Sequence, residues 1–321
     1  MDRRQWLQWG LGSAGLLAGA AHAQKVEALP ELRIVIPASL GGGWDQTGRE
    51  LGSALQSARL VDKVQFENIG GKAGTIGLAQ FVERYNTTPN TLLMGGMVML
   101  GGIALQQAAI DTAKVTPMAE LTSDYLVVAV PAASPIKTVA DLVKSLRQPD
   151  FKATCVGGSA GGVDHMLMGM MLRAARAQPE NYNYLATAGG AEAVKALQDG
   201  RAQIGISGLS EFRPEIESGR LRALAISSRK GRMGLPSLRE SGLDTELANW
   251  RGVFAPKGIS EPQRNQLATL LDRVSRTAEW NDTLRRNNWV GSYRAGPEFA
   301  QFVETEQTMA RVVVHMLRLK S

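Results

Sequence analysis

The sequence predicts an α/β protein with mainly parallel sheets, arranged as two lobes around a cleft. Short runs of β-branched or aliphatic residues alternate with segments whose apolar residues recur at three- and four-residue spacing. Strands and helices that alternate in this way form parallel sheets flanked by helices. The length of 321 residues suits about two domains of ordinary size.

The expected elements follow one another along the whole chain. The strands are expected at 32–37, 63–68, 91–95, 125–131, 153–157, 181–185, 203–207, 221–227 and 250–255. The helices are expected at 45–57, 75–85, 138–147, 163–175, 190–199, 261–277 and 297–317. The uncharged stretch 92–105 is too short to span a bilayer and is predicted to be buried core.

The organisation of these elements predicts that one lobe is inserted into the other. A new series of alternating strands and helices begins near Tyr125. A polar segment at 228–234 follows Ser227, and there the chain would cross from one lobe to the other. We therefore expect the first lobe to comprise 24–123 and 228–321 and the second lobe to comprise 124–227. Two connections without a long flexible linker indicate a hinge, with a cleft between the lobes.

Composition excludes several classes of protein. One cysteine and three histidines exclude disulfide scaffolds and cysteine-rich zinc modules, and we expect neither a metal ion nor a cofactor. The 36 basic and 30 acidic residues are interspersed, so the net charge of +6 indicates a mild preference for anions. Dispersed basic residues without an aromatic stripe argue against nucleic acid as a partner.

The N-terminus has the pattern of an export signal. Arg3 and Arg4 precede the apolar run 6–20, and Ala21 and Ala23 supply the small residues that a signal peptidase reads. We expect residues 1–23 to be a signal peptide, cleaved near Ala23, and the mature protein to be periplasmic. The segment 3–7 also fits the twin-arginine pattern, so the Sec and twin-arginine routes both stay open.

Two glycine-rich loops of the first lobe are candidates for binding an anion. The loop P-A-S-L-G-G-G-W-D at 37–45 leads from a strand into a helix, where bare amides and a helix N-terminus favour negative charge. Asp45 is expected to be the helix N-cap and not a catalytic base. The loop N-I-G-G-K-A-G-T-I-G at 68–77 is not a P-loop, because Ala73 follows the lysine. Lys72 extends either toward a ligand carboxylate or into solvent.

The second lobe carries matching loops. They are G-G-S-A-G-G-V-D-H at 157–165, A-G-G-A-E at 188–192 and G-I-S-G at 205–208. Since the carboxyl ends of strands are where open α/β sheets bind ligands, loops on two lobes would face one cleft and form a clamp.

One of these loops also fits a hydrolase. G-G-S-A-G at 157–161 matches the G-x-S-x-G nucleophile elbow between a strand and a helix, and the glycines at 41–43 are similar to the oxyanion glycines of esterases. The available bases argue against this alternative. His165 lies on the same helix only six residues past Ser159, and His315 lies in an amphipathic C-terminal helix.

The motifs together resemble a known family, the periplasmic substrate-binding receptors of tripartite tricarboxylate transporters, also called Bug receptors. The resemblance rests on P-x-x-x-G-G-G-W-D, N-x-x-G-x-x-G-x-x-G, G-G-S-A-G-G-x-D-H, A-G-G-x-E-A, G-I-S-G-x-x-E-F and N-W-R-G-V-F-A-P-K-G-I, in this order. Trp44 with its preceding glycines, and the stretch 249–252, resemble the tricarboxylate branch. The chain departs from the family pattern at Leu40, where proline is usual, and at Lys72 and Ala73.

The resemblance implies a two-lobed periplasmic binding protein of type II, a Venus flytrap, and not an enzyme. Such a receptor would capture a small di- or tricarboxylate, citrate-like, and deliver it as a monomer to membrane permease subunits. Two alternatives to this function are a ligand sensor that acts with a membrane sensor kinase and an esterase that uses Ser159. The role of His165 stays open: its side chain would either contact the ligand or help to cap the start of the helix. The residues that the resemblance assigns to the ligand site are Leu40, Gly42, Gly43, Trp44, Gly71, Gly74, Ser159, Ala160, Gly161, His165, Gly189, Gly190 and Ser207.

Overall fold

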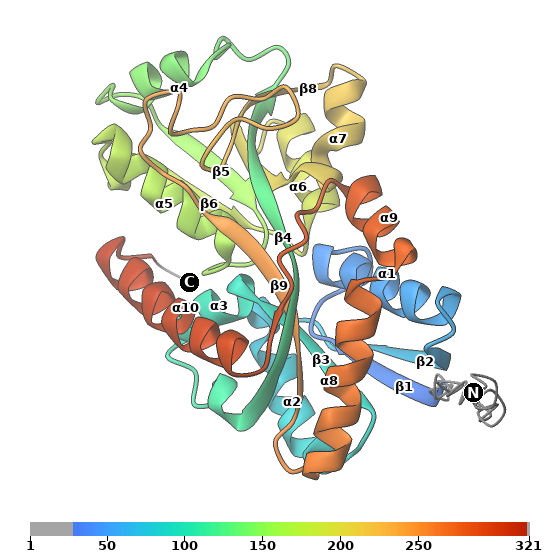
Figure 1. Ribbon diagram of the computed structural model, residues 1–321. Coiled ribbons are helices and arrows are strands. Elements are labelled where there is room, and N and C mark those ends of the chain that lie inside the picture. Colours follow the sequence, from blue (N-terminus) through green and yellow to red (C-terminus); the bar gives the residue numbers. More distant parts are fainter. Residues whose placement is uncertain (1–27, 320–321) are drawn as a thin grey trace, which may run out of the picture.

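The computed structural model describes residues 28–319, so the predicted signal peptide lies outside the described residues. Figure 1 shows an upper and a lower part, each with helices packed on a sheet, joined by two strands that run through the middle. These strands are β4 (Val115–Pro131) and β9 (Ala248–Pro256), which pair antiparallel. The α/β class predicted from the sequence is confirmed, with a mixed sheet.

The first sheet forms the lower part of Figure 1. Its strands β1 (Leu29–Ile36), β2 (Val61–Asn68) and β3 (Thr91–Gly96) are parallel, whereas β9 runs antiparallel to β3. The helices α1 (Gly43–Ser57), α8 (Glu261–Ser275) and α9 (Ala278–Asn287) cover one face, and α2 (Thr75–Tyr85), α3 (Met97–Gln106) and α10 (Gly296–Met316) cover the other. The short strand β10 (Arg294–Ala295) pairs with β4.

The second sheet forms the upper part. The strands β5 (Ala153–Gly157), β6 (Tyr182–Ala186) and β7 (Ile204–Gly208) are parallel, and β4 pairs antiparallel with both β7 and β8 (Leu221–Ile226). The helices are α4 (Val139–Leu146), α5 (Val163–Ala175), α6 (Gly190–Gln198) and α7 (Leu209–Glu217). Single 3-10 turns lie at Lys72–Gly74, Thr112–Lys114 and Pro179–Asn181.

Strand β4 belongs to both sheets, which the sequence did not predict. It pairs with β9 up to Tyr125 and with β7 and β8 from Leu126 onward. We expected the strand to begin at Tyr125, but it begins at Val115 and contains Pro117 beside a register shift. Because a β-bulge leaves a residue unpaired, it can accommodate a proline that would break a regular ladder.

Three helices were also missed, each for its own reason. The core stretch 92–105 contains most of α3, which has apolar residues on all sides and therefore shows no amphipathic pattern. Helix α7 contains Pro214, a residue that argues against a helix interior. Helix α9 buries only Trp280 and Thr283. Within residues 28–319 we find no helix with the length and apolar character needed to cross a membrane.

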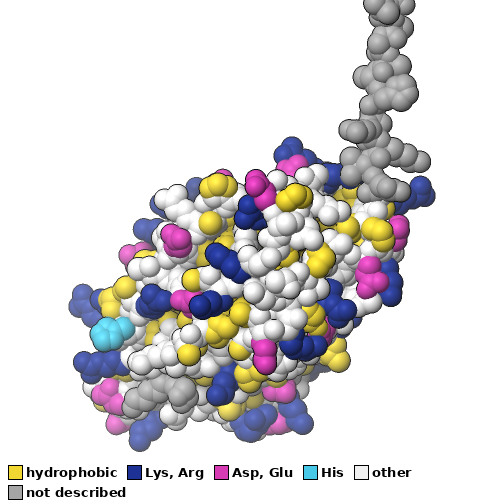
Figure 2. Space-filling view, turned by 90° about the horizontal axis from the view of Figure 1, so that it is seen from below, with side chains coloured by type: hydrophobic (Ala, Val, Ile, Leu, Met, Phe, Trp, Pro, Cys, Tyr) yellow, Lys and Arg dark blue, Asp and Glu magenta, His cyan; other side chains and the backbone are white. Residues whose placement is uncertain are grey.

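Charges are spread over the surface and do not gather into one patch on the face seen from below. Figure 2 shows basic and acidic side chains interspersed with apolar and uncharged surface across this face. A surface of this kind does not have the single-sign field of a nucleic-acid-binding face.

Gly252 in β9 allows the central strands to pair closely, which gives a test of the fold. A Cβ at Gly252 would lie 2.6 Å from the carbonyl oxygen of Ala119 on β4 and 2.8 Å from the Phe299 ring. We expect Gly252→Ala to lower the free energy of unfolding by about 1–3 kcal/mol, because overpacking forces the backbone to shift. Gly291→Ala is the control, since its Cβ would meet only a Leu284 methyl group, at 3.0 Å. Equal urea midpoints for the two variants would contradict the prediction.

Candidate functional site

A cavity of about 1030 Å³ lies between the two sheets and is lined by residues from both. The loops that follow β1, β2, β5, β6 and β7 form its walls, and β9 contributes Asn249 and Arg251. A cavity of this size can hold a small organic molecule. Its position at the carboxyl ends of the parallel strands agrees with the general rule for α/β sheets.

Most of the residues predicted from the motifs lie at this cavity. Those that line it are Gly42, Gly43, Trp44, Gly71, Gly74, Ser159, Ala160, Gly189 and Ser207. Those that do not are Leu40, Gly161, His165 and Gly190. Leu40 is 73% exposed, and Gly161 and Gly190 lie in the lining loops without facing the cavity. A place on the cavity wall does not show that a residue binds a ligand, so the binding role of these residues stays a prediction.

The loop after β1 is held by Asp45. Its Oδ2 atom accepts a hydrogen bond from the Gly41 amide at 2.9 Å, and its Oδ1 atom accepts from Arg49 and Asn68. Burial raises the pKa of Asp45, but these hydrogen bonds lower it more, so the pKa lies below its ordinary value. The prediction that Asp45 is the N-cap was wrong, because Gly42 occupies that position. Asp45 lies in the first turn and orients the loop from there.

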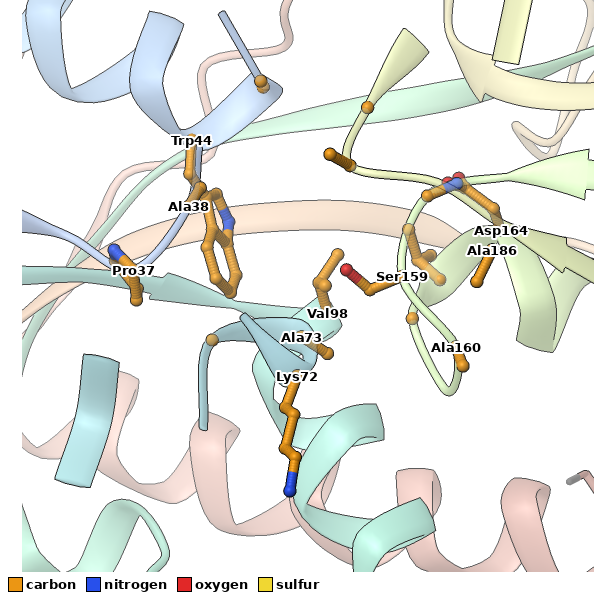
Figure 3. A pocket seen from close by; sticks show the side chains of 18 of the residues that line it. Pro37, Ala38, Trp44, Lys72, Ala73, Val98, Ser159, Ala160, Asp164 and Ala186 are labelled. Atoms are coloured by element: carbon orange, nitrogen blue, oxygen red, sulfur yellow. The ribbon is translucent and has the colours of Figure 1, made fainter. Parts of the chain in front are cut away.

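Trp44 forms one wall of the cavity. Its ring lies so close to the second loop that a Cβ at Gly74, where φ is +89°, would be 2.6 Å from Cζ3. Glycine is therefore required at position 74 both by the backbone conformation and by the indole ring. In Figure 3 the indole nitrogen of Trp44 and the hydroxyl of Ser159 face one another across the cavity.

Lys72 lies at the edge of the cavity. Figure 3 shows its ammonium group pointing away from both Trp44 and Ser159. Its backbone is left-handed, with φ at +48°, and its carbonyl accepts hydrogen bonds from Gln106 and Thr75 at 2.9 Å. The backbone is thus fixed, while the side chain extends away from the centre of the cavity.

The loop between β5 and α5 is held from behind by three side chains. Asp164 accepts from the Gly158 amide at 2.6 Å, and Nδ1 of His165 accepts from the Gly161 amide at 3.1 Å. Tyr184 stacks on His165 with ring centroids 4.1 Å apart and donates to the Gly158 carbonyl. Burial lowers the pKa of His165 to about 4, so the ring is neutral at physiological pH. In the structure His165 therefore serves as a hydrogen-bond acceptor for the loop that leads into α5.

The same geometry argues against an esterase. A serine nucleophile needs a base that accepts its proton. Within residues 28–319 we find no hydrogen bond between the Ser159 hydroxyl and either histidine, and Nδ1 of His165 is occupied by the Gly161 amide. The same residues contain no group of three or more His, Cys, Asp or Glu side chains that could hold a metal ion.

Acidic side chains also hold the remaining two loops. Glu211 accepts from the Ser207 hydroxyl at 2.7 Å and from the Gly190 amide at 3.0 Å, and Glu192 accepts from the Ala188 amide at 3.0 Å. In the loop after β6 two backbone amides, those of Ala188 and Gly190, thus donate to carboxylates of the protein. Other amides stay available. In the described part of the chain no hydrogen bond is made by the backbone amides of Gly43, Trp44, Ser159 and Ala160.

Arg251 on β9 connects the cavity floor to the surrounding elements. It is 2% exposed and donates to Asp124 at 3.1 Å and to Thr47 at 2.9 Å. Its guanidinium also lies over the Trp289 ring, 5.2 Å from the centroid. Because these partners engage both terminal nitrogens, Arg251 organises the floor and is not a free cation for a ligand.

Two buried carboxyl groups, Asp164 on the cavity wall and Asp124 beside Arg251, have raised pKa values. Burial raises the pKa of Asp124 to about 6 in spite of the opposing effect of Arg251, and it raises the pKa of Asp164 to about 7 in spite of the Gly158 hydrogen bond. The charge on Glu211 adds to both shifts. Asp164, which lines the cavity, therefore carries a proton in a large fraction of molecules near neutral pH, which reduces its repulsion of an anion, whereas Asp124 is mainly ionised there and pairs with Arg251.

Sequence reasoning did not assign a role to five of the residues that organise the site. These residues are Asp124, Thr187, Glu211, Asn249 and Arg251. Glu211, Asn249 and Arg251 stand inside motifs that the resemblance used, so their positions were visible although their roles were not. Asp124 and Thr187 carry no signal in the sequence, because their contacts depend on the folded arrangement of strands.

The pH dependence of stability tests the environment of Asp164. Its pKa is 3.8 in the unfolded chain and about 7 in the folded protein. Since the folded pKa is raised, its stabilising contribution is complete below the unfolded pKa and is lost as the pH rises through about 7. His165, with its lowered pKa, acts in the opposite direction, but only below its ordinary value of 6.5.

Asp164 therefore lowers the free energy of unfolding as the pH rises from about 4 to about 7, by up to about 1.4 kcal/mol per pH unit for one proton, and His165 offsets this fall up to about pH 6.5. Asp164→Asn should remove the contribution of Asp164, because the amide does not titrate, so the free energy of unfolding of the wild type should fall relative to that of the variant across this range. Urea unfolding across the pH range measures it, with the exposed Asp62→Asn as the control. An unchanged slope in Asp164→Asn would show that Asp164 does not titrate there.

Comparison with known proteins supports the fold seen here. The chain matches a solved structure described as a periplasmic transporter with a TM-score of 0.81 and 21% identity, over 91% of this chain and 98% of the other. It also matches MatC from Rhodopseudomonas palustris with bound malate, with a TM-score of 0.77 and 21% identity, over 89% and 99% of the two chains. An R. palustris protein with adipate gives a TM-score of 0.81 at 20% identity, over 91% and 98%.

Comparison of sequences gives the family. A UPF0065 protein of the tcbD-tcbE intergenic region of a Pseudomonas strain is 29% identical over 96% of this chain and 96% of its own length. A second UPF0065 protein, from Agrobacterium vitis, is 27% identical over 81% of this chain and 75% of its own. The model of the tripartite tricarboxylate transporter family receptor matches residues 50–319. The chain therefore belongs to the tripartite tricarboxylate transporter receptor family, whose members are solute receptors and not enzymes.

Proposed function

We propose that the protein captures a small di- or tricarboxylate in the periplasm and delivers it to the permease subunits of a tripartite tricarboxylate transporter. The observation that carries the proposal is the set of four available amides, from Gly43, Trp44, Ser159 and Ala160, on two loops that line one cavity. Malate and adipate in two structures of the same fold support a carboxylate ligand. Among residues 28–319 no feature favours a sensor kinase over a permease as the partner.

The energetics suit such a receptor without a free arginine. A hydrogen bond to a charged oxygen contributes about 1.5–3 kcal/mol. Four of them can exceed an association cost of about 4 kcal/mol or more and leave micromolar affinity. The starts of α1 and α5 each add a helix N-terminus, which contributes roughly 0.3–1 kcal/mol toward an anion. Moderate affinity allows the receptor to release its ligand as well as bind it.

The proposal includes two lobes that close on the ligand, with the first lobe at 24–123 and 228–321 and the second at 124–227. It is supported by the transfer of β4 from the first sheet to the second after Tyr125. The two halves also meet beside the cavity. A Cβ at Gly101 on α3 would lie 2.0 Å from the Gly161 carbonyl oxygen, and a Cβ at Gly189 would lie 3.6 Å from the Gly42 Cα.

A ligand panel tests the binding proposal. We expect at least one acid from a panel of di- and tricarboxylates to raise the midpoint of thermal unfolding and to change tryptophan fluorescence. Ser159→Ala should weaken binding by about 10- to 100-fold, the loss expected for one hydrogen bond to a charged group. Exposed Ser218→Ala is the matched control. The absence of any response across the panel would refute the function.

The contact between Gly101 and Gly161 tests closure separately from ligand contact. In Gly101→Ala the added methyl group would collide with the Gly161 carbonyl and hold the halves apart. We expect about tenfold weaker binding, or a larger loss, with no loss of the unfolding midpoint in the absence of ligand. Small-angle scattering should then show that ligand no longer compacts the variant. Unchanged affinity would mean that this contact does not accompany binding.

A further inference from the structure

The C-terminal end of α10 reaches from one half of the molecule to the other. The body of α10 packs on the first half, where Phe299 and Phe302 contact Trp250 of β9 with ring centroids 5.8 and 5.4 Å apart. The Trp250 indole also donates to Glu306 at 3.1 Å. The helix ends at Met316, close to α5 of the second half (Figure 1). Helix α10 is thus fixed to one half, and the residues that follow it lie against the other.

Gly169 of α5 is the point at which the end of α10 touches the second half. A Cβ at Gly169 would lie 2.7 Å from Cδ1 of Leu317 and 3.1 Å from Cδ2 of Leu319, so both leucines rest directly on the backbone of α5. Glycine makes a helix interior less stable than alanine does. The close approach of the two leucines gives a physical reason for a glycine in the middle of α5, where it is buried.

A Schellman motif sets the direction of the tail, which we define as residues 317–319. The amide of Leu319 donates to the Val314 carbonyl, and the amide of Arg318 donates to the His315 carbonyl, both at 3.2 Å. These are the two hydrogen bonds of the motif, and Arg318 has the left-handed backbone that it requires, with φ at +49°. The tail is therefore held in a defined turn over α5 and is not a continuation of the helix.

We propose that the tail is a latch that holds the two halves in the arrangement in which their loops line one cavity. This inference rests on the proposed movement of two lobes and adds to it a segment that sets the balance between the closed and open forms. The strands β4 and β9 connect the halves covalently, whereas the tail connects them only through two leucine side chains. Separation of the halves at α5 would expose these side chains to water, so the hydrophobic effect favours the latched form.

The tail adds little to the core of the first half. The side chains that α10 buries are Phe299, Val303, Ala310 and Val314, and all of them precede the tail. Leu317 and Leu319 are only partly buried. Loss of the contact with Gly169 should therefore change how the halves sit relative to one another and leave each half folded. This separates a latch from ordinary core packing.

Small-angle scattering without ligand tests the latch. We expect Leu317→Ala/Leu319→Ala to have a larger radius of gyration than the wild type, with an unchanged midpoint of urea unfolding. Whichever of citrate, malate, succinate and adipate binds the wild type should bind this variant about three- to tenfold more weakly, because fewer molecules are in the competent arrangement. Met309→Ala is the matched control, since Met309 lies on the same helix and is 50% exposed. A wild-type radius of gyration in the double variant would overturn the latch.

Gly169→Ala tests the same contact from the side of α5. The added methyl group would displace the leucines, whereas alanine favours the helix, so α5 should stay folded. We expect Gly169→Ala to expand the ligand-free protein as the double variant does, and the triple variant to expand no further, because all three changes break one contact. A wild-type radius in Gly169→Ala, or additive expansion in the triple variant, would overturn the role of this contact. Failure of every acid to bind would refute the proposed function, while scattering without ligand would still decide whether the latch exists.

Discussion

The buried pair of Arg251 and Asp124 is the interaction on which the rest of the site depends. It joins β9 to β4 at the level where β4 passes from one sheet to the other, and it extends to α1 through Thr47. Both side chains are almost fully buried, so the pair is costly to form. Removal of either partner would leave an uncompensated charge in the interior, which typically costs about 3–5 kcal/mol. The floor of the cavity is therefore fixed before any ligand arrives.

Carboxylates of the protein decide which amides are free for a ligand. Asp45, Asp164, Glu192 and Glu211 each engage an amide of a lining loop, and the amides left over lie in the first turn of α1 and in the loop that precedes α5. Acidic residues around an anion site are thus compatible with anion binding, because their carboxylates are hydrogen-bonded to the loops. The acids hold the loops in place, and one of the buried carboxyl groups, Asp164, carries a proton in a large fraction of molecules close to neutral pH.

The sequence allowed the class of fold and most of the cavity loops to be predicted, because both follow from local patterns. Glycines after strands mark turns wherever they occur, and nine of the thirteen predicted site residues line the cavity. The groups that organise the loops could not be predicted in the same way. Arg251 and Asp124 are 127 residues apart, and Glu211 and Gly190 are 21 apart, so their contacts exist only in the folded chain. Helix α3 and the first half of β4 were missed because their apolar residues recur neither at helical spacing nor at every second position.

The position of β9 in the chain also sets the order in which the molecule can assemble. Its partner β3 ends at Gly96, yet β9 begins only at Ala248, after the entire second sheet. The first sheet cannot be completed until the chain has passed through the second one and returned. Pairing of segments so distant in sequence is slow, because loop-closure entropy must be overcome before the contacts form. A nascent chain would therefore expose the open edge of β3 until β9 has been synthesised, and chaperone protection would matter at that edge.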